Sequence, residues 1–490
     1  MTALADGNLA DSGDIAGLSA LDRKVYAHLA DRVVLKRLTR WNEAYKDFPR
    51  FVMEYLCARY IDPHNPARGQ AIIDKLLKEH YVDSSEVQLI KSEIREKGAY
   101  ALLGSLAVRL DERADEYWAD VPAIASNKVR IAPAVLHEYR DVLLTTGAWG
   151  TMRIEWDRRK ENDSAPFRVT QFTPFQVTRL SLDDYIERRA LFSDDEWIDL
   201  LISSIGFEPS RLSQTEKWLY LLRLVPFVEK NYNMLELGPR ETGKTFFFRN
   251  MSSRVAIVSG GAASQATLFY NAARNVTGIV GVAQVVYFDE IGNTKFQDPE
   301  VTISILQDYM SSGQYTRAGR PFTSTASIVM GGNIDCDMLN RRPASKYANL
   351  FEPLPEELGQ RTAFLDRIHA YLPGWEMPKI VADNYAAGFG FMTDYLAAIF
   401  DRLRARNCQG IVEQRARLDG LKSRDLDAVK KTAAGLLKIV YPHRDAESVT
   451  HSEIAACVDL AVRCRQRVVT ELGKIAPAEF RGIVLDVPVD

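Results

Sequence analysis

Apolar residues recur every three or four positions over long parts of the chain, which is the spacing of helices that bury one face. This pattern covers 21–118, which is also rich in charge, and it returns over 182–232 and 376–490. Residues 1–20 are acidic, rich in glycine and alanine, and lack the pattern. We therefore expect a disordered tail, an N-terminal helical domain, a helical linker, and a helical lid with a C-terminal tail.

Short β-type runs dominate two other parts of the chain. Over 119–181 they include Trp149–Trp156 and Phe167–Phe172 and are separated by proline, glycine and charged turns. This pattern predicts a small β-rich domain, which an OB-like barrel would fit. Over 233–375 buried runs alternate with helical stretches, which predicts an α/β core.

Polar side chains follow three buried runs of the α/β core. The runs are Met234–Leu237, Val285–Phe288 and Ser327–Gly332, and polar or glycine-rich residues come directly after each. Since the carboxyl ends of parallel strands meet at one edge of a sheet, these residues should line one crevice. The candidate chemistry is therefore expected at that edge.

The first run leads into Gly238–Thr245, which has the Gly-x4-Gly-Lys-Thr spacing of a phosphate-binding loop. Gly238 and Gly243 allow the backbone to turn so that successive N–H groups face a polyphosphate at the start of a helix. Lys244 is expected to reach the β- and γ-phosphates of ATP, and the Thr245 hydroxyl to bind Mg²⁺. The spacing predicts a nucleoside triphosphate site.

Residues at the ends of the other two runs extend this prediction to hydrolysis. Asp289 would hold Mg²⁺, and Glu290 would orient and activate the attacking water. Asn333 would hydrogen-bond that water or the γ-phosphate. The alternatives are a solvated acidic turn for the two carboxylates and an ordinary loop asparagine for Asn333. We favour a nucleoside triphosphatase.

Arg367 lies among apolar residues, in the segment Phe364–His369. A cation at this point of the chain is expected to neutralise developing charge on the nucleotide of a neighbouring subunit. The alternative is a simple ion pair with Asp366 or Glu352.

A C-terminal helix is predicted over Thr450–Leu472, where Thr450 and Glu453 form a capping box. Arg465 falls in the middle of its apolar stripe. A guanidinium on a face that packs inward is costly unless an anion meets it. We expect this anion to be either the bound γ-phosphate, which makes Arg465 an ATP-binding residue, or an acid of the core domain.

Charge and cysteine content exclude several other classes of protein. The formal net charge is −3, so any nucleic-acid surface must be local. The five cysteines form no C-x-x-C pair, which indicates reduced thiols and neither a disulfide framework nor a zinc site. No apolar run approaches the roughly 20 residues that span a bilayer, and no secretory signal pattern is present. We expect a cytoplasmic protein without membrane contact.

Two basic stretches are candidate DNA contacts. Lys36, Arg37 and Arg40 lie near Trp41 and Tyr45, a combination that can hold phosphates and stack on bases. A solvated helix face is the alternative for this stretch.

The second stretch is Gln314–Pro321, which predicts a β-hairpin with its tip at Ala318 and Gly319. In a ring this hairpin would project into the pore, where Arg317 and Arg320 would follow a phosphate backbone. An ordinary exposed turn is the alternative.

Several motifs of the α/β core occur together in one known family. They are Leu237–Thr245, Ser259–Gly261, Leu268–Asn271, Phe288–Glu290, Asp308–Gly313, Gly332–Ile334 and His369–Trp375. The chain resembles the BrxL family, the Lon-related component of BREX bacteriophage-defence systems, closely over about 232–375 and more loosely elsewhere. The residues that match its nucleotide-site motifs are Lys244, Thr245, Asp289, Glu290, Asn333 and Arg367.

The resemblance implies an AAA+ ring ATPase that uses ATP and Mg²⁺, binds DNA, acts against phage and is similar in core layout to minichromosome maintenance helicases. The ring would be a hexamer or heptamer, alone or stacked in a double ring, with other BREX components as further partners. Longer relatives continue into a Lon-type protease domain, for which Gly473–Asp490 is too short. We therefore expect no proteolysis by this chain.

Three functions stay open at this point. The favoured one is a DNA-binding motor in phage defence. The second is an ATPase that threads and remodels proteins, for which Tyr315 near the hairpin tip would serve as the aromatic pore residue. The third is a nucleotide-gated scaffold that assembles on DNA with little motor activity.

Overall fold

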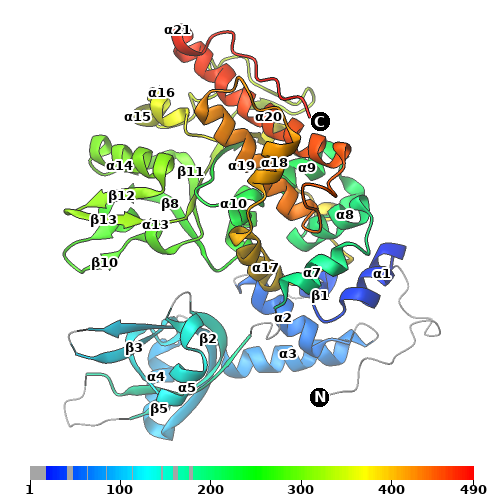
Figure 1. Cartoon of the computed structure of the whole chain (residues 1–490). Coiled ribbons are helices and arrows are strands. Elements are labelled where there is room, and N and C mark those ends of the chain that lie inside the picture. Colours follow the sequence, from blue (N-terminus) through cyan, green and yellow to red (C-terminus); the bar gives the residue numbers. More distant parts are fainter. Residues whose placement is uncertain are drawn as a thin grey trace. The chain divides into compact units, whose positions relative to one another are not determined.

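The chain folds as two compact units, residues 1–179 and 180–490 (Figure 1). The computed structural model describes residues 18–40, 48–62, 65–83, 85–112, 114–144, 147–157, 164–175 and 180–489. The predicted tail therefore lies outside the described residues up to residue 17.

The first unit begins with a helical part, as its amphipathic pattern predicts. Its elements are α1 (Ala20–Leu29), β1 (Val33–Leu35), the 3-10 turn η1 (Lys36–Thr39), α2 (Arg50–Tyr60), α3 (Pro66–His80) and α4 (Val87–Lys97). Ser19 and Asp22 form a capping box that starts α1. Gly98, with a φ of 78°, ends α4 in the left-handed conformation that glycine adopts without strain.

A closed five-stranded barrel completes the first unit. Its strands are β2 (Ala99–Asp111), β3 (Glu116–Val121), β4 (Ser126–Ile131), β5 (Ala148–Trp156) and β6 (Phe167–Pro174), in the order β2-β3-β4-β6-β5. The β4–β6 pair is parallel and the others are antiparallel. Between β4 and β5 lie α5 (Pro133–Glu138) and α6 (Arg140–Leu143), and η3 (Pro122–Ile124) precedes β4.

The barrel begins earlier than the predicted boundary at residue 119. Strand β2 starts at Ala99, so the segment predicted as helical already contains the first strand and the start of β3. Leu102, Leu106 and Val108 are buried in the barrel core with the period of a strand. The neighbouring Leu103 is buried as well, which hides this alternation in the sequence.

A five-stranded parallel sheet forms the centre of the second unit. Its strands are β7 (Asn233–Gly238), β8 (Val255–Ala263), β11 (Val285–Phe296), β14 (Ser327–Asn333) and β17 (Ala370–Pro373). They lie in the order β17-β7-β14-β11-β8. The three runs predicted as buried strands are thus neighbours in one sheet, and β14 lies between the other two.

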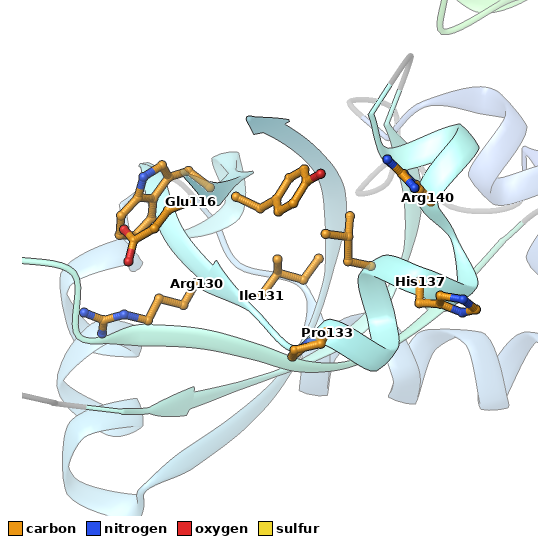
Figure 2. A pocket seen from close by; sticks show the side chains of 9 residues that line it. Glu116, Arg130, Ile131, Pro133, His137 and Arg140 are labelled. Carbon is orange, nitrogen blue, oxygen red and sulfur yellow. The ribbon is translucent and has the colours of Figure 1, made fainter. Parts of the chain in front are cut away.

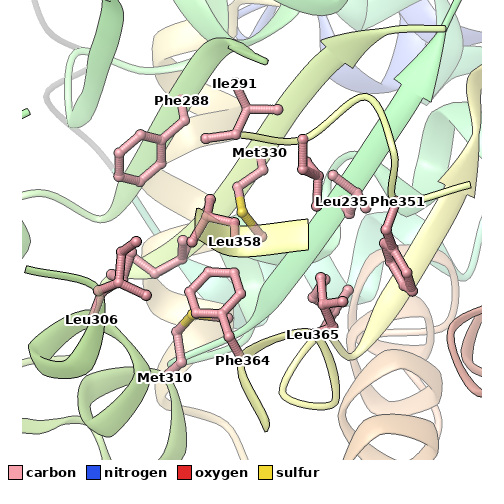
Figure 3. Close-up of a cluster of buried hydrophobic side chains, with 14 of the residues drawn as sticks. Leu235, Phe288, Ile291, Leu306, Met310, Met330, Phe351, Leu358, Phe364 and Leu365 are labelled. Atoms are coloured by element: carbon pink, nitrogen blue, oxygen red, sulfur yellow. The ribbon is translucent and has the colours of Figure 1, made fainter. Parts of the chain in front are cut away.

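The hydrophobic core of this unit packs against one face of the sheet (Figure 3). Leu235, Phe288 and Met330 reach it from three adjacent strands, and Leu306 and Phe364 come from the helices that cover them. Every one of these side chains is at most 1% exposed. Their burial fixes the register of the strands, and hence the positions of the residues at the strand ends.

Helices and short strands surround the sheet. Before it come α7 (Leu182–Arg189), α8 (Asp194–Ile205), η4 (Pro209–Arg211), α9 (Gln214–Leu222) and α10 (Val225–Val228). Within it come α11 (Lys244–Met251), α12 (Gln265–Leu268), β9 (Tyr270–Asn271), β10 (Val276–Thr277), α13 (Ile279–Val282), α14 (Pro299–Ser312), β12 (Gln314–Arg317), β13 (Arg320–Thr323), β15 (Cys336–Asp337), β16 (Arg342–Pro343), α15 (Glu356–Gly359) and α16 (Thr362–Leu365).

The predicted lid is largely helical. Its elements are η5 (Gly374–Glu376), η6 (Ala382–Asn384), β18 (Phe389–Phe391), α17 (Thr393–Ala405), α18 (Gln409–Arg415), α19 (Ser423–Val440), α20 (His451–Ile475) and α21 (Pro477–Phe480). The capping box of Thr450 and Glu453 that opens α20 is confirmed. Helix α19 packs along α20, and α20 also contacts strand β17 of the sheet. In the part of the chain that the structure describes, no helix is both long and apolar enough to cross a membrane.

Candidate nucleotide-binding site

The loop 238–245 joins the carboxyl end of β7 to the start of α11. Gly243 has a φ of 73°, so a residue with a side chain would be strained there. Gly238 is required for a different reason, because a Cβ added to it would lie 2.6 Å from the Gly374 Cα. The two glycines of the motif thus serve a left-handed turn and a close approach of two chain segments.

The Lys244 ammonium lies inside this loop. Its Nζ donates hydrogen bonds to the carbonyl oxygens of Gly238, at 3.2 Å, and Pro239, at 2.8 Å. Burial lowers the pKa of this amine. The loop therefore already encloses a positive charge, at the place where the motif expects phosphate.

Thr245 and Asp289 meet across the sheet edge. The Thr245 Oγ1 donates a hydrogen bond of 2.7 Å to Asp289 Oδ1. Asp289 lies on β11 at the point where its regular pairing with β8 is interrupted, between Asp289 and Thr294. A hydroxyl and a carboxylate oxygen held together are ligands of the type that Mg²⁺ prefers, so these two residues fit a magnesium site.

Glu290 on β11 and Asn333 at the end of β14 lie at the same edge of the sheet. Glu290 has a φ of 51°, an uncommon conformation for a residue with a side chain, and its Oε2 accepts a hydrogen bond of 3.2 Å from Asn293. Asn333 ends β14, pairs in register with Gly238 and is exposed. Residues with strained backbones cluster at functional sites, so the positive φ of Glu290 supports a functional role for this residue.

All of these side chains line one pocket of about 280 Å³. Its lining residues are Arg240, Glu241, Thr242, Gly243, Lys244, Thr245, Phe246, Asp289, Glu290, Gly331, Gly332 and Asn333. The structure thus brings together the residues that the sequence predicts from three separate segments.

A buried ion pair between Arg223 and Glu236 contacts the backbone of the loop. Arg223 donates to Glu236 through Nε, at 3.0 Å, and Nη2, at 2.5 Å, and both side chains are 0% exposed. The same Nη2 donates to the Thr242 carbonyl oxygen at 3.1 Å. Sequence reasoning missed this pair. The available signal was a glutamate in the middle of an otherwise apolar strand.

Arg367 lies at the opposite edge of the sheet from the loop. It follows α16 and precedes β17, and its carbonyl oxygen accepts a hydrogen bond from Asn233 at the amino end of β7. Its guanidinium donates to the Ala363 carbonyl oxygen. The ion pair proposed as the alternative is not formed with Asp366 or Glu352 in the described part of the chain.

The prediction that Arg465 binds ATP is wrong, and its alternative, an ion pair with an acid, is the observed arrangement. Arg465 is 1% exposed and bonds to Asp366 Oδ1 at 2.6 Å and to Asp425 Oδ1 at 2.7 Å. Its Nη1 donates to the carbonyl oxygens of Asp366 and Ile368. These partners lie at the amino ends of the strands, whereas the loop 238–245 lies at the carboxyl ends.

The predicted hairpin is confirmed. Strands β12 and β13 pair antiparallel, and Ala318 and Gly319 form the turn with φ values of 51° and 74°. Arg320 donates to Tyr270 Oη and Asn275 Oδ1, each at 3.0 Å, which joins this hairpin to the β9–β10 hairpin. The exposed Arg274 lies in the turn of that second hairpin, and sequence reasoning missed it because Arg274 is distant along the chain.

The prediction that Lys36 contacts DNA is wrong. Its side chain is 0% exposed and pairs with Glu54 at 2.7 Å, and burial lowers its pKa although Glu54 opposes the shift. Arg37 and Arg40 are exposed. Trp41 and Tyr45, which were expected beside them, lie outside the described residues.

A second pocket of about 380 Å³ lies on the barrel, between β3, β4 and α5 (Figure 2). The described pairing of β3 with β4 stops at Ala119 and Val129, which leaves this space open beside them. Glu116 and Arg140 lie on different sides of it. Since charges of both signs line the pocket, its chemistry favours no single class of ligand.

Two family models match this chain over most of its length. Residues 167–486 match the family described as "Lon-like protease BrxL-like, ATPase domain", and residues 27–156 match "BREX system Lon protease-like protein BrxL N-terminal". The protein "Lon-like protease BrxL" of Bacillus cereus (strain H3081.97) is 36% identical over 470 residues, which cover 94% of this chain and 68% of that protein.

The protein of the same name from Escherichia coli O9:H4 (strain HS) is 34% identical over 464 residues, which cover 94% of this chain and 66% of that protein. The chain therefore spans about two thirds of the length of these relatives. The chain belongs to the BrxL family.

Proposed function

We propose that the chain is an ATP hydrolase of the AAA+ class that uses Mg²⁺ and works on DNA in a BREX phage-defence system in the cytoplasm. The observation that carries the proposal is the grouping of Lys244, Thr245, Asp289, Glu290 and Asn333 around one pocket at the carboxyl edge of a parallel sheet. The match to the ATPase domain of the family supports the same function.

The topology of both units supports the finer assignment of folds. Strand β17, the last of the sheet in chain order, lies beside β7, the first. Strand β14 lies between β7 and β11, and the loop 238–245 follows β7, as in AAA+ P-loop ATPases. In the barrel, β2 pairs with β3 and β5, and the helices α5 and α6 connect β4 to β5. This is the arrangement of an OB-like domain.

The chemistry follows from what each side chain touches. Lys244 exchanges its two carbonyl partners for the β- and γ-phosphate oxygens of ATP. Thr245 and Asp289 hold Mg²⁺, which neutralises phosphate charge when it is bound. Glu290 accepts a proton from the attacking water, and Asn333 holds that water or the γ-phosphate.

The proposal includes a ring of identical subunits, a hexamer or heptamer, alone or stacked in a double ring. Arg367 supports it, because this residue lies at the sheet edge opposite its own nucleotide loop. An arginine in that place stabilises transition-state charge only on the nucleotide of another subunit.

Two joined hairpins support DNA as the partner. Arg274, Arg317 and Arg320 lie on the β9–β10 and β12–β13 hairpins, which the Arg320 bonds to Tyr270 and Asn275 hold together. Basic residues grouped on projecting turns are typical of phosphate-backbone contacts. Other BREX components are further partners in this proposal.

The alternative of a protein-threading ATPase loses its main support. Tyr315, the aromatic residue near the hairpin tip, is 4% exposed and donates to the Phe269 carbonyl oxygen at 3.2 Å. A buried tyrosine does not grip a polypeptide. A nucleotide-gated scaffold would hydrolyse ATP more slowly than the favoured motor, so the ATP turnover rate distinguishes the two.

Steady-state ATP hydrolysis in the presence of Mg²⁺ tests the proposal. Wild type should hydrolyse ATP, and Lys244→Ala should not. Lys379→Ala is the matched control, because this lysine is 49% exposed and pairs with Glu241 of the same loop. A wild type without activity, or a Lys244→Ala variant as active as wild type, would contradict the proposal.

A further inference from the structure

The β12–β13 hairpin is attached to the rest of its unit at a narrow base. Its first strand follows α14 through Gly313, and its second strand ends directly before Ser324. The Ser324 N–H donates to the Gly313 carbonyl oxygen at 2.9 Å, which closes the hairpin at this base. Contacts made at the base therefore fix the position of the hairpin and of Arg317, which it carries.

Asn231, two residues before β7, holds one side of the base. Its Nδ2 donates to the Ser324 carbonyl oxygen, at 3.0 Å, and to Tyr309 Oη of α14, at 3.1 Å. Its main-chain N–H donates to the Thr325 carbonyl oxygen at 3.1 Å. A Cβ added to Gly313 would lie 2.9 Å from the same Nδ2, so the asparagine approaches where only a glycine leaves room. One side chain thus binds the helix that enters the hairpin and the segment that leaves it.

Asn233, the first residue of β7, holds the other side of the base. It is 0% exposed, and its Nδ2 donates to the carbonyl oxygens of Met310 and Arg367, each at 3.0 Å. Met310 lies in the last turn of α14, where carbonyl groups lack partners within the helix. One amide group therefore joins the helix that leads into the hairpin to the segment that contains Arg367.

Both asparagines are held in arrangements that cost stability. Asn231 has a φ of 51°, which is uncommon for a residue with a side chain. The buried Asn233 Oδ1 has no hydrogen-bond partner among the residues that the structure describes, and an unpaired buried acceptor is unfavourable. Strained residues cluster at functional sites, and unpaired buried groups are rare in folded proteins. The two asparagines are therefore candidates for a role beyond folding.

Strand β7 connects this place to the nucleotide loop. All six of its residues are buried, and its two ends lie about 17 Å apart. It pairs with β14 on one side and β17 on the other. In its middle Glu236 pairs with Arg223, which donates to the Thr242 carbonyl oxygen of the loop. The strand therefore links the hairpin base to the nucleotide of the same subunit, and Arg367 links it to the nucleotide proposed for the neighbour.

We infer that Asn231 and Asn233 are positioning residues that hold the hairpin base, strand β7 and the Arg367 segment in one arrangement, so that DNA bound at the hairpin raises the rate of ATP hydrolysis. The inference rests on the proposed ATP hydrolysis and DNA contact. Neither asparagine lines the nucleotide pocket, so each acts through the hydrogen bonds that it makes. DNA that shifts the hairpin base shifts the partners of both asparagines, and with them the groups around the nucleotide.

Steady-state kcat with and without duplex DNA tests the inference in two variants. Asn231→Gly deletes the amide and allows the positive φ, and Asn233→Ala removes both donor hydrogens. In both variants the ratio of kcat with DNA to kcat without DNA should fall to about 1, from the higher ratio of wild type. Without DNA, Asn231→Gly should keep kcat within about twofold of wild type, because its contacts do not include Arg367.

Tyr232→Phe is the matched control for these variants. Tyr232 lies between the two asparagines in the chain, is 0% exposed, and shares a hydrogen bond of 2.8 Å between its hydroxyl and Thr432 Oγ1. The variant loses a buried hydrogen bond of the same segment without loosening the hairpin base. It should therefore keep the wild-type ratio of the two kcat values.

DNA affinity and unfolding midpoints separate a positioning role from a structural one. Because Arg274 and Arg317 are unchanged, both asparagine variants should bind DNA with a dissociation constant within about threefold of wild type. Asn231 is half-buried, so Asn231→Gly should keep the wild-type unfolding midpoint and decides the inference alone if Asn233→Ala does not fold. A joint loss of DNA affinity, kcat without DNA and unfolding midpoint in Asn231→Gly would mean a structural role only and would overturn the inference.

The same measurements distinguish this inference from the function on which it rests. If wild type does not hydrolyse ATP, or hydrolyses it at a rate that DNA does not change, the proposed function fails and the inference fails with it. If DNA stimulates wild type and the asparagine variants to the same extent, the proposed function stands and only the role of the two asparagines is wrong.

Discussion

The Thr245 hydroxyl donates a hydrogen bond of 2.7 Å to the Asp289 carboxylate, although 44 positions separate the two residues in the chain. The contact exists because β7 and β11 flank β14 in a parallel sheet, so that the loop after one strand and the acids at the end of the other meet at the carboxyl edge. The contact places a hydroxyl and a carboxylate together at the edge where the proposed site would hold Mg²⁺.

Glu290→Gln should retain ATP binding and lose turnover. The amide keeps the shape of the side chain but cannot accept a proton from water, so kcat should fall by about 10²–10⁴-fold. Separate measurements of nucleotide affinity and kcat check this. Glu300→Gln, at a glutamate that is 88% exposed, is the control. Unchanged turnover in Glu290→Gln would remove Glu290 from the catalytic role.

Arg223→Ala should destabilise the ATPase unit by about 3–5 kcal/mol, because it leaves the Glu236 carboxylate buried without a partner. Chemical denaturation measures the change. The double variant Arg223→Met with Glu236→Leu should be much closer to wild type in stability, since no unpaired charge remains. Equal losses in the single and double variants would mean that packing, and not charge, causes the effect.

Stability should depend on pH through His369. Burial lowers its pKa from 6.5 to about 4, and its Nδ1 accepts a hydrogen bond of 2.8 Å from the Asn233 N–H, as only an unprotonated Nδ1 can. Its Nε2 lies 3.0 Å from Asp427, beside Lys431. As pH falls from about 6.5 to 4, the unfolded chain binds a proton that the folded one does not, so about 3 kcal/mol of stability is lost.

Unfolding free energies measured between pH 7 and pH 4 check this prediction. His369→Gln should flatten the pH dependence in that window, whereas His451→Gln, at an exposed histidine that begins α20, should not. An identical slope in wild type and His369→Gln would show that another group is responsible.

DNA affinity should depend on the two joined hairpins. If Arg274 and Arg317 contact phosphates, each alanine substitution should weaken binding and reduce the slope of log affinity against log salt by about 0.9. Fluorescence anisotropy at several salt concentrations measures both effects. Arg211→Ala, at an exposed arginine outside the hairpins, is the control. Slopes that do not change in any hairpin variant would place DNA elsewhere.

The sequence predicts the grouping of the candidate residues around one pocket, because most of them lie at strand ends. Gly238, Asp289 and Asn333 lie at the ends of buried apolar runs, and parallel pairing brings such ends to one edge whatever the loops between them do. The hairpin turn at Ala318 and Gly319 is local in the same sense, since the turn residues determine it.

Predictions that required knowing a partner failed. Periodicity shows that the Arg465 side chain points inward but not which anion meets it, and Lys36 was expected to be exposed although it is buried against Glu54. Their partners, Asp366 and Glu54, are distant in the chain and come from the tertiary fold. The start of the barrel at Ala99 was missed because consecutive buried leucines obscure the alternation of a strand.

The central claim, an ATP hydrolase that works on DNA, is tested most directly by steady-state ATP hydrolysis with and without duplex DNA. Lys244→Ala is the inactive variant, and Lys379→Ala is the surface control. We predict that wild type and Lys379→Ala hydrolyse ATP, that DNA increases their rates, and that Lys244→Ala is inactive in both conditions. ATP hydrolysis that DNA does not change, together with no DNA binding under the same conditions, would contradict the account.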